Sequence, residues 1–359
     1  GQTEWSEHFP DCGGASQSPV DVATIQTRFD PGLTPLTPLG YDQHGHKPFT
    51  LHNNGHTGKP GSGGEGVPAT ALAGAAGTPR LLLLSPSAVV ELPDWMGLSG
   101  LPWLFTAAQM HLHWGERGPE PGRQRTHRQR AECRCRETPS ALASSPPQLH
   151  VVHYNSELYP NMSAATSQRD GLAVLGVLIV TGEETNPAFD HILNYLSRVR
   201  HADQTVYIPA FDIRSLLPRD LRRYYRYNGS LTTPPCHQGV TWTLFHERVQ
   251  ISKAQLLKME TTLYSSKVGD ADMVLLQDNY RSTQPLNRRM VLASFPAESW
   301  KELSSGEVTA IVIGAMCGCV GLAVIVRFIV KTIRGKEPEK AKESKNDVAL
   351  KATSEGEKK

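Results

Sequence analysis

The sequence predicts a mainly β domain followed by one transmembrane helix, and three observations support this fold class. His111 and His113 alternate with apolar residues, which is the two-residue period of a β-strand. A second apolar run that carries histidines, residues 148–153, predicts a neighbouring strand. Residues 308–326 form an uncharged, mostly apolar run that is long enough to span a bilayer as a helix.

The length and charge of the chain limit its size class and its partners. The chain has 359 residues, which is enough for a large core and predicts one or two domains. Its formal net charge is only +2, so it lacks the strongly basic character of proteins that bind nucleic acids. We therefore expect no nucleic-acid partner.

The C-terminal part predicts a membrane anchor with a defined orientation. Arg327, Lys331 and Arg334 follow the apolar run, so the positive-inside rule places the C-terminus in the cytoplasm. Export of the preceding domain requires a signal peptide, which we expect to have been removed before Gly1. The sequence thus predicts a single-pass type I protein of the plasma membrane, with an extracellular domain at 1–297, a juxtamembrane stalk at 298–307, a transmembrane helix at 308–330 and a cytoplasmic tail at 331–359.

Three small residues lie four positions apart within the expected span, so they share one helix face: Ala310, Gly314 and Gly318. Small residues at this spacing let two membrane helices approach closely and could form a homodimer. Glycine and alanine are also common in membrane helices that do not dimerise. The sequence leaves both interpretations open.

The histidines indicate a metal site. His111 and His113 are two residues apart in the expected strand, so their side chains point to the same face. Such a pair alone is more often structural than metal-binding. A third ligand could come from the neighbouring strand, where His150 and His153 point to opposite faces, so at most one of them can join the pair. Three neutral imidazoles with an open fourth position are typical of a catalytic zinc site.

Eight motifs occur in the order that is typical of one enzyme family. By these motifs the sequence resembles the α-class carbonic anhydrases, in particular their single-pass membrane isoforms. The resemblance implies a large twisted, mostly antiparallel central sheet with short surface helices, zinc as the cofactor, and reversible hydration of carbon dioxide to bicarbonate at the cell exterior. The motifs are Gln17–Asp21, Leu51–Thr57, Gln109–Gly115, Leu149–Tyr154, Gly171–Gly176, Tyr227–Cys236, Val240–Trp242 and Asn279–Arg288.

The same resemblance assigns catalytic roles to residues of this chain. It implies that His56 passes the released proton to solvent, since histidine titrates near neutral pH. It also implies that the hydroxyl of Thr232 orients the attacking group. The implied zinc ligands are His111, His113 and His150. The implied wall of the carbon dioxide and bicarbonate site is Val152, Val174, Leu231, Thr233, Val240 and Trp242.

Further residues acquire supporting roles from the resemblance. Gln109, Gln148 and Asn279 are expected to hold the three ligand rings through hydrogen bonds. Cys12 and Cys236 occupy the positions of the disulfide in exported members, and closing so long a loop should stabilise the fold by roughly 4–5 kcal/mol. Two sequons, at Asn161 and Asn228, predict N-glycosylation.

The chain departs from the family pattern at two supporting positions. Gln148 stands where the family has a glutamate, and a neutral amide makes the ligand that it supports less basic. Such changes typically cost ~10–100-fold in metal affinity or activity. The family's glutamate that accepts the proton of the Thr232 hydroxyl is missing from residues 122–130. These losses favour an alternative function, a catalytically impaired or silent ectodomain that acts at most as a binding module.

Two segments, residues 58–94 and 117–147, have no counterpart in the family. The first is rich in glycine, alanine and proline where the family has a strand, so we expect the sheet to have lost that strand. Gly58 and Lys59 can be encoded by a splice-donor sequence, and residues 123–130 permit codons that spell the family motif one base out of frame. We therefore interpret the two segments as a retained intron and a local frameshift, which the transcript sequence would test.

Overall fold

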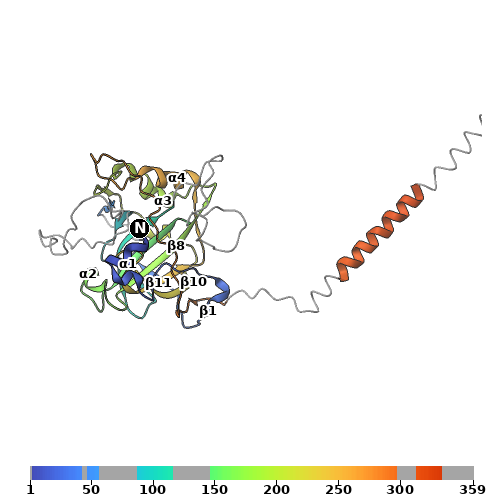
Figure 1. Ribbon diagram of the computed structural model, residues 1–359, viewed down its shortest axis with the longest axis horizontal. Coiled ribbons are helices and arrows are strands. Elements are labelled where there is room, and N and C mark those ends of the chain that lie inside the picture. Colours follow the sequence, from blue (N-terminus) through green and yellow to red (C-terminus); the bar gives the residue numbers. More distant parts are fainter. Residues whose placement is uncertain (1, 43–46, 56–86, 116–145, 297–312, 334–359) are drawn as a thin grey trace, which may run out of the picture. The chain divides into compact units, whose positions relative to one another are not determined.

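The computed structural model describes residues 2–42, 47–55, 87–115, 146–296 and 313–333, and the chain divides into two units, 1–297 and 298–359. The first unit is a β domain with short helices, and the second contains one long helix (Figure 1). The expected proton-transfer residue His56 and residues 117–145 of the second altered segment lie outside the described residues.

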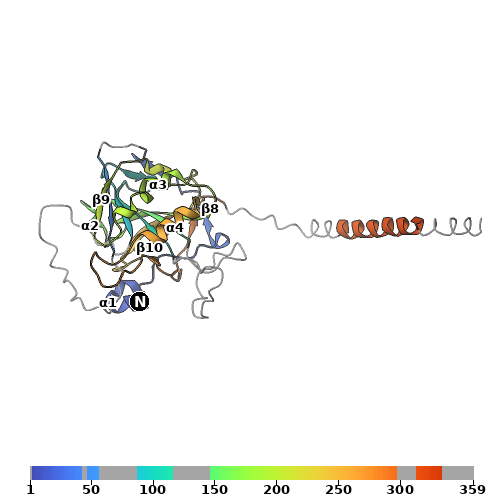
Figure 2. The ribbon, with the colours of Figure 1, turned by 90° about the horizontal axis from the view of Figure 1, so that it is seen from above.

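One large sheet organises the first unit (Figures 1 and 2). Among the described residues it has 13 strands, with the path β1-β13-β10-β11-β8-β7-β6-β4-β3-β9 and with β2, β5 and β12 attached to its side. Nine of the pairings are antiparallel, and three are parallel. The mainly β, mostly antiparallel fold class is therefore confirmed. The strands are β1 Arg28–Phe29, β2 Thr37–Leu39, β3 Phe49–Asn53, β4 Ala88–Glu91, β5 Gly97–Ser99, β6 Phe105–His113, β7 Gln148–Asn155, β8 Leu172–Gly182, β9 Thr205–Ile208, β10 Tyr224–Ser230, β11 Gln238–Phe245, β12 Val249–Ser252 and β13 Leu292–Ala293.

Side chains alternate along the central strands between two environments. On β6, Met110 and Leu112 are buried in the larger hydrophobic cluster, and on β7, Leu149 and Val151 join them. Val152 belongs to a second, smaller cluster that also contains Val174, Trp242 and other residues of β8, β10 and β11. Because side chains of a strand alternate between faces, we call the first side the core face and the other the histidine face.

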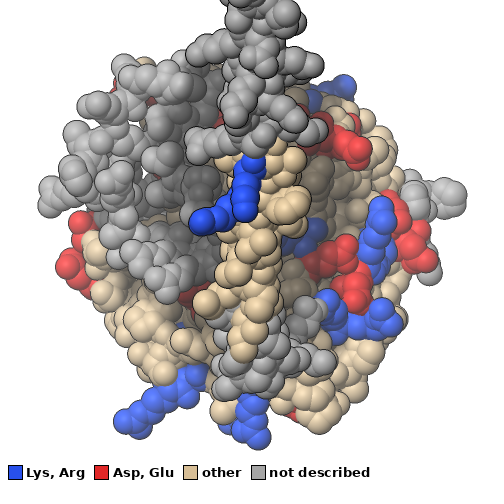
Figure 3. Space-filling model, turned by 90° about the vertical axis from the view of Figure 1, so that its right-hand side faces the viewer, with Lys and Arg blue, Asp and Glu red and all other residues tan. Residues whose placement is uncertain are grey.

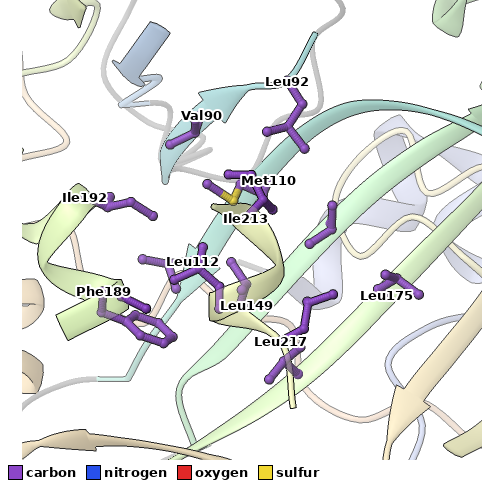
Figure 4. Close-up of a cluster of buried hydrophobic side chains, with 14 of the residues drawn as sticks. Val90, Leu92, Met110, Leu112, Leu149, Leu175, Phe189, Ile192, Ile213 and Leu217 are labelled. Carbon is purple, nitrogen blue, oxygen red and sulfur yellow. The ribbon is translucent and has the colours of Figure 1, made fainter. Parts of the chain in front are cut away.

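Two helices cover the core face. These are α3 (Pro187–Leu193) and α4 (Lys253–Thr262), which lie side by side in both ribbon views (Figures 1 and 2). Asn186 caps the start of α3, with Pro187 in its first turn, and Ser252 and Gln255 form a capping box at the start of α4. Phe189 and Ile192 of α3 project toward Leu112 and Leu149 of the sheet, as Figure 4 shows.

The remaining helices are short. The α-helices α1 (Trp5–His8) and α2 (Met162–Ala165) and the 3₁₀ turns at Gln2–Glu4, Pro10–Gly13, Thr24–Gln26, Leu196–Arg198 and Ile213–Leu216 lie among the strand connections. On the side of the molecule shown in Figure 3, basic and acidic side chains lie beside one another, in keeping with the small net charge.

The expectation that the sheet lost a strand after residue 57 was wrong. Ala88–Glu91 forms β4, which lies between β3 and β6 with antiparallel pairing on both sides. Asn54 and Ser87 are hydrogen-bonded to each other: Asn54 N donates to Ser87 O at 3.2 Å, and Ser87 N donates to Asn54 Oδ1 at 2.6 Å. The sheet therefore has a strand between β3 and β6.

The N-terminal segment is fastened to the turn after β10. Cys12 and Cys236 form a disulfide, in agreement with the sequence-based expectation. Arg281 lies buried beside it and donates to Cys12 O at 2.9 Å and to Gln17 Oε1 at 2.7 Å. Ser18 N donates to Ser230 Oγ at 3.0 Å, so the N-terminal segment reaches the last residue of β10. The turn that follows, which carries Thr232 and Thr233, thus starts from a fixed point.

The second unit contains a helix at Ile313–Ile333, which has 21 residues and a mean hydropathy of 2.3. It is long and apolar enough to cross a membrane, as expected. The described helix continues three residues past the expected boundary at 330. The side-chain hydroxyl of Thr332 donates to Phe328 O. Gly314 and Gly318 have open space around them, whereas Ala310 and the expected start at 308 lie outside the described residues.

Candidate metal centre

Two neighbouring strands bring three histidines together. His111 and His113 project from β6, and His150 lies directly opposite His111 on β7 in the antiparallel register. One ring nitrogen from each of the three lies within 4.8 Å of the others, and all three side chains are buried. The ring centroids of His113 and His150 are 4.5 Å apart, and those of His111 and His113 are 4.9 Å apart. His153 is on the core face, so it is the histidine of β7 that does not join the cluster.

Asn279 holds His113 from the outside of the cluster. The Nδ1 of His113 lies 2.6 Å from the carbonyl oxygen of Asn279, so it carries the proton and donates it to that oxygen. The Asn279 side chain accepts from Trp114 N at 2.7 Å and donates to Leu112 O at 3.2 Å, which fixes it on both sides of the ligand. The other ring nitrogen of His113, Nε2, is buried without a hydrogen-bond partner among the described residues.

Gln148 holds His150. The His150 Nε2 lies 3.1 Å from the amide oxygen Oε1 of Gln148, so Nε2 donates the proton and Nδ1 is the basic nitrogen. The ring of Trp242 packs against His150 edge to face, with the centroids 5.0 Å apart. Gln109 lies close to the cluster, yet the described residues contain no hydrogen bond between it and His111. The expected support of His111 by Gln109 therefore stays a prediction.

Burial keeps all three imidazoles neutral at physiological pH. Loss of solvation lowers the pKa of His113 to about 4, although its hydrogen bond to Asn279 opposes the shift. Burial lowers the pKa of His111 and His150 well below the ordinary value, and repulsion from the neighbouring imidazoles adds to the effect. A neutral imidazole is the form of histidine that binds a metal.

The cluster fits a zinc ion by the chemistry of its donors. Two of the rings are oriented by oxygen acceptors outside the cluster, an arrangement typical of metal-binding histidines. An uncompensated buried nitrogen such as His113 Nε2 is costly in a folded protein unless a ligand occupies it. Three nitrogen donors that leave a coordination position open match a catalytic zinc site.

A pocket opens over the cluster. Its walls contain the expected residues Val152, Val174, Leu231, Thr233 and Trp242, together with Thr232, Gln109, His111 and His150. Val240, the remaining residue of the expected wall, is buried in the smaller hydrophobic cluster and does not line the pocket. Asn54 and Val89 also line it and were not identified from the sequence. The Leu51–Thr57 motif contains Asn54, whereas Val89 lies in the segment that we expected to carry no strand.

Fold and site together place the chain in a known class. A family model of eukaryotic-type carbonic anhydrases matches residues 1–73 and 85–295. The chain belongs to this family, whose members catalyse the carbonate dehydratase reaction. It is 35% identical to carbonic anhydrase 12 of Homo sapiens over 340 residues, 95% of this chain and 84% of the relative. It is 34% identical to carbonic anhydrase 6 of Mus musculus over 297 residues, 82% of this chain and 78% of the relative. Carbonic anhydrase 15 of Mus musculus is 33% identical over 298 residues, 82% of this chain and 80% of the relative.

Proposed function

We propose that this chain catalyses the zinc-dependent, reversible hydration of carbon dioxide to bicarbonate and a proton. His113 would hold the zinc through Nε2 and His150 through Nδ1. His111 would hold it through a ring nitrogen that faces the cluster. When bound, zinc supplies a Lewis acid that activates water at neutral pH. Membership of the carbonic anhydrase family and the three buried histidines support the proposal.

The pocket wall suits a small uncharged substrate. Val152, Val174 and Leu231 present apolar side chains next to His150, and Trp242 closes that side. Carbon dioxide carries no charge, so it enters an apolar pocket without the desolvation penalty that a charged competitor incurs. Thr232 and Thr233 bring hydroxyl groups to the same pocket, where they would orient the attacking group and receive bicarbonate. These roles are part of the proposal.

The single observation that carries the proposal is the convergence of three neutral imidazoles, two of them oriented by Asn279 and Gln148. The test is to purify the full chain in detergent, to determine its zinc content, and to measure carbon dioxide hydration by stopped flow with and without an aromatic sulfonamide. One zinc per chain and sulfonamide-sensitive turnover are expected. A folded chain that binds zinc and shows no turnover would be the impaired or silent variant, which the neutral Gln148 favours.

We also propose that the domain acts outside the cell. The helix at Ile313–Ile333 would be the single span of a type I plasma-membrane protein. We propose that, among such isoforms, the chain corresponds to carbonic anhydrase fourteen. Asn161 and Asn228 are exposed, as N-glycosylation requires. Protection of the C-terminal tail from protease in sealed, right-side-out plasma-membrane vesicles tests the orientation. A mobility shift after glycosidase treatment tests the glycosylation.

We also propose that the chain forms a homodimer through Ala310, Gly314 and Gly318. Small residues allow close helix packing, and Gly314 and Gly318 have unoccupied space around them. Replacing Gly318 with leucine should abolish cross-linked dimers in membranes, whereas Ala323→Leu, on the opposite face of the helix, serves as the control. Dimers that survive Gly318→Leu would exclude this surface.

A further inference from the structure

Three large apolar side chains are exposed around the strand at one end of the sheet. β1 is the first strand of the sheet path, and Figure 1 shows it at the margin of the domain. Ile25 is 91% exposed, Phe29 is 44% exposed and Met290 is 51% exposed. Single exposed apolar side chains are common on soluble domains, so exposure alone assigns no role to them. Their common position is what distinguishes these three.

Contacts between two distant parts of the chain bring these residues together. Arg28 on β1 is paired with Leu292 on β13. The Arg28 side chain also reaches Met290, with Nη1 4.0 Å from Sδ. Ile25 lies in the short turn directly before β1, three residues from Arg28. We call this group the β1 edge, which consists of Ile25, Arg28, Phe29 and Met290.

The last described residues of the domain lie at the same edge. β13, which pairs with β1, is the last strand, and the described part of the domain ends at residue 296. The apolar helix of the second unit begins at Ile313. The segment 297–312 between them can span at most about 55 Å when it is fully extended. A bilayer that holds the helix therefore stays within reach of the β1 edge, which favours lipid over a freely diffusing partner.

The charges at this edge suit a phospholipid surface. Arg28 is exposed, and so is Arg288, two residues before Met290. A guanidinium group donates two parallel hydrogen bonds to a phosphate, and its stem packs on apolar surface. The acidic neighbour on the strand, Asp30, has a partner of its own, since its Oδ1 accepts from Gly32 N at 2.8 Å. Apolar side chains beside exposed arginines match the boundary between lipid headgroups and acyl chains.

We propose that the β1 edge docks on the outer surface of the bilayer that holds the C-terminal helix, which rests on the membrane anchor in the proposed function. Ile25, Phe29 and Met290 enter the boundary between headgroups and acyl chains, because transfer of exposed apolar surface out of water is favourable. Arg28 donates to lipid phosphates. The covalent tether keeps the local concentration of lipid high, so a contact that would be weak between separate molecules is sufficient.

The test is methionine methyl NMR of the full chain in phosphatidylcholine nanodiscs whose lipids carry a nitroxide, which broadens the signals of nearby methyl groups. With the nitroxide on the headgroup, Met290 should lose its signal. Met273 should keep its signal, because it is similarly exposed but its segment lies at the other end of the sheet path, beside β9. With the nitroxide in the acyl chain, Met316 of the helix should lose its signal.

A double variant separates docking from the effect of the tether, which by itself also keeps Met290 near lipid. In the Ile25→Ser, Phe29→Ser protein, Met290 should recover most of its signal. Val268→Ser is the matched control, since Val268 is an exposed apolar side chain in the same segment as Met273, and it should leave the Met290 signal broadened.

Internal signals report on the fold of each variant. Met110 and Met259 are buried, so unchanged positions of their methyl signals show that the substitutions at the surface left the core intact. This readout does not depend on turnover, so it stays valid whether or not the chain hydrates carbon dioxide.

The contrary outcomes are distinct. A Met290 signal that keeps its intensity in the wild type, or that is equally broadened in the double variant, would overturn the proposal. A Met290 signal that stays sharp but shifts when a disc holds two chains would assign the β1 edge to a second copy instead. If Met316 also keeps its signal, the helix is not inserted, and the proposed membrane anchor fails together with the docking.

Discussion

Strand β7 has two faces that place different demands on the sequence. Leu149 and Val151 point into the larger hydrophobic cluster, whereas His150 and Val152 point to the metal pocket. The core face is filled by apolar side chains from many elements. Its contribution to the stability of the fold therefore depends mainly on side-chain volume and burial. The histidine face depends on particular nitrogen atoms and on the oxygen atoms that orient them. Substitutions of neighbouring residues on this strand should therefore have different effects. A change on the histidine face should affect metal binding, and a change on the core face should affect stability.

The largest expected effect is on the histidine face. His150→Ala removes one of three metal donors, and loss of a bound Lewis acid costs several kcal/mol of transition-state stabilisation, a fall in kcat/KM of ~10³-fold or more. Zinc content and stopped-flow hydration measure the effect, and the melting temperature of the zinc-free protein should change little. If His150→Ala retains zinc and turnover, the ligand assignment is wrong.

The neighbouring residue on the core face should show the opposite pattern. Leu149 is 0% exposed, and Leu149→Ala should lower the free energy of unfolding by ~2–5 kcal/mol through lost burial and the cavity left behind. Chemical denaturation measures the loss. The fraction that remains folded should bind zinc with wild-type stoichiometry. A stable Leu149→Ala protein that loses zinc would show that the two faces are not separable.

His153 is a polar group on the core face, and its burial predicts a pH dependence. It is 0% exposed, contacts the hydroxyl of Tyr41, and has a pKa lowered by burial to about 4. The unfolded chain takes up this proton below about pH 6.5 while the folded chain does not, so stability present above pH 6.5 falls as the pH approaches 4. Over that window the loss is about 3 kcal/mol.

The measurement for His153 is a comparison of unfolding free energies at several pH values with a chelator present. His153→Gln should remove this part of the slope, and the difference from wild type cancels the contributions of the other histidines. Parallel pH curves for the two proteins would refute the assignment.

The smallest effect concerns the support of a ligand. Gln148→Glu would give His150 Nε2 a charged acceptor in place of an amide, which raises the basicity of Nδ1. We expect zinc affinity to rise by about tenfold, the lower end for changes around a metal site. Competition with a chelator measures it, and Gln250→Glu at an exposed site controls for the added charge. An equal gain in both variants would assign the effect to net charge alone.

The sequence predicted the parts of the site that depend on local spacing. The two-residue period placed His111 and His113 on one face, and family motifs indicated His150, Asn279 and the disulfide. The strand at Ala88–Glu91 escaped detection because four residues after a glycine-rich stretch carry little local signal, whereas pairing with β3 and β6 stabilises them. Asn54 and Val89 were missed for the same reason, since pairing between distant segments brings them to the pocket. Spacing also could not give the rotamer of Gln109.

The central claim is that the three histidines of this chain form a working zinc centre. The most direct measurement is carbon dioxide hydration by the full-length protein after zinc removal and after stoichiometric zinc return. We predict that turnover disappears with the metal and returns with one zinc per chain. The Leu149→Ala protein should show the same recovery, whereas the His150→Ala protein should not. A zinc-loaded, folded wild-type protein without turnover would contradict the account.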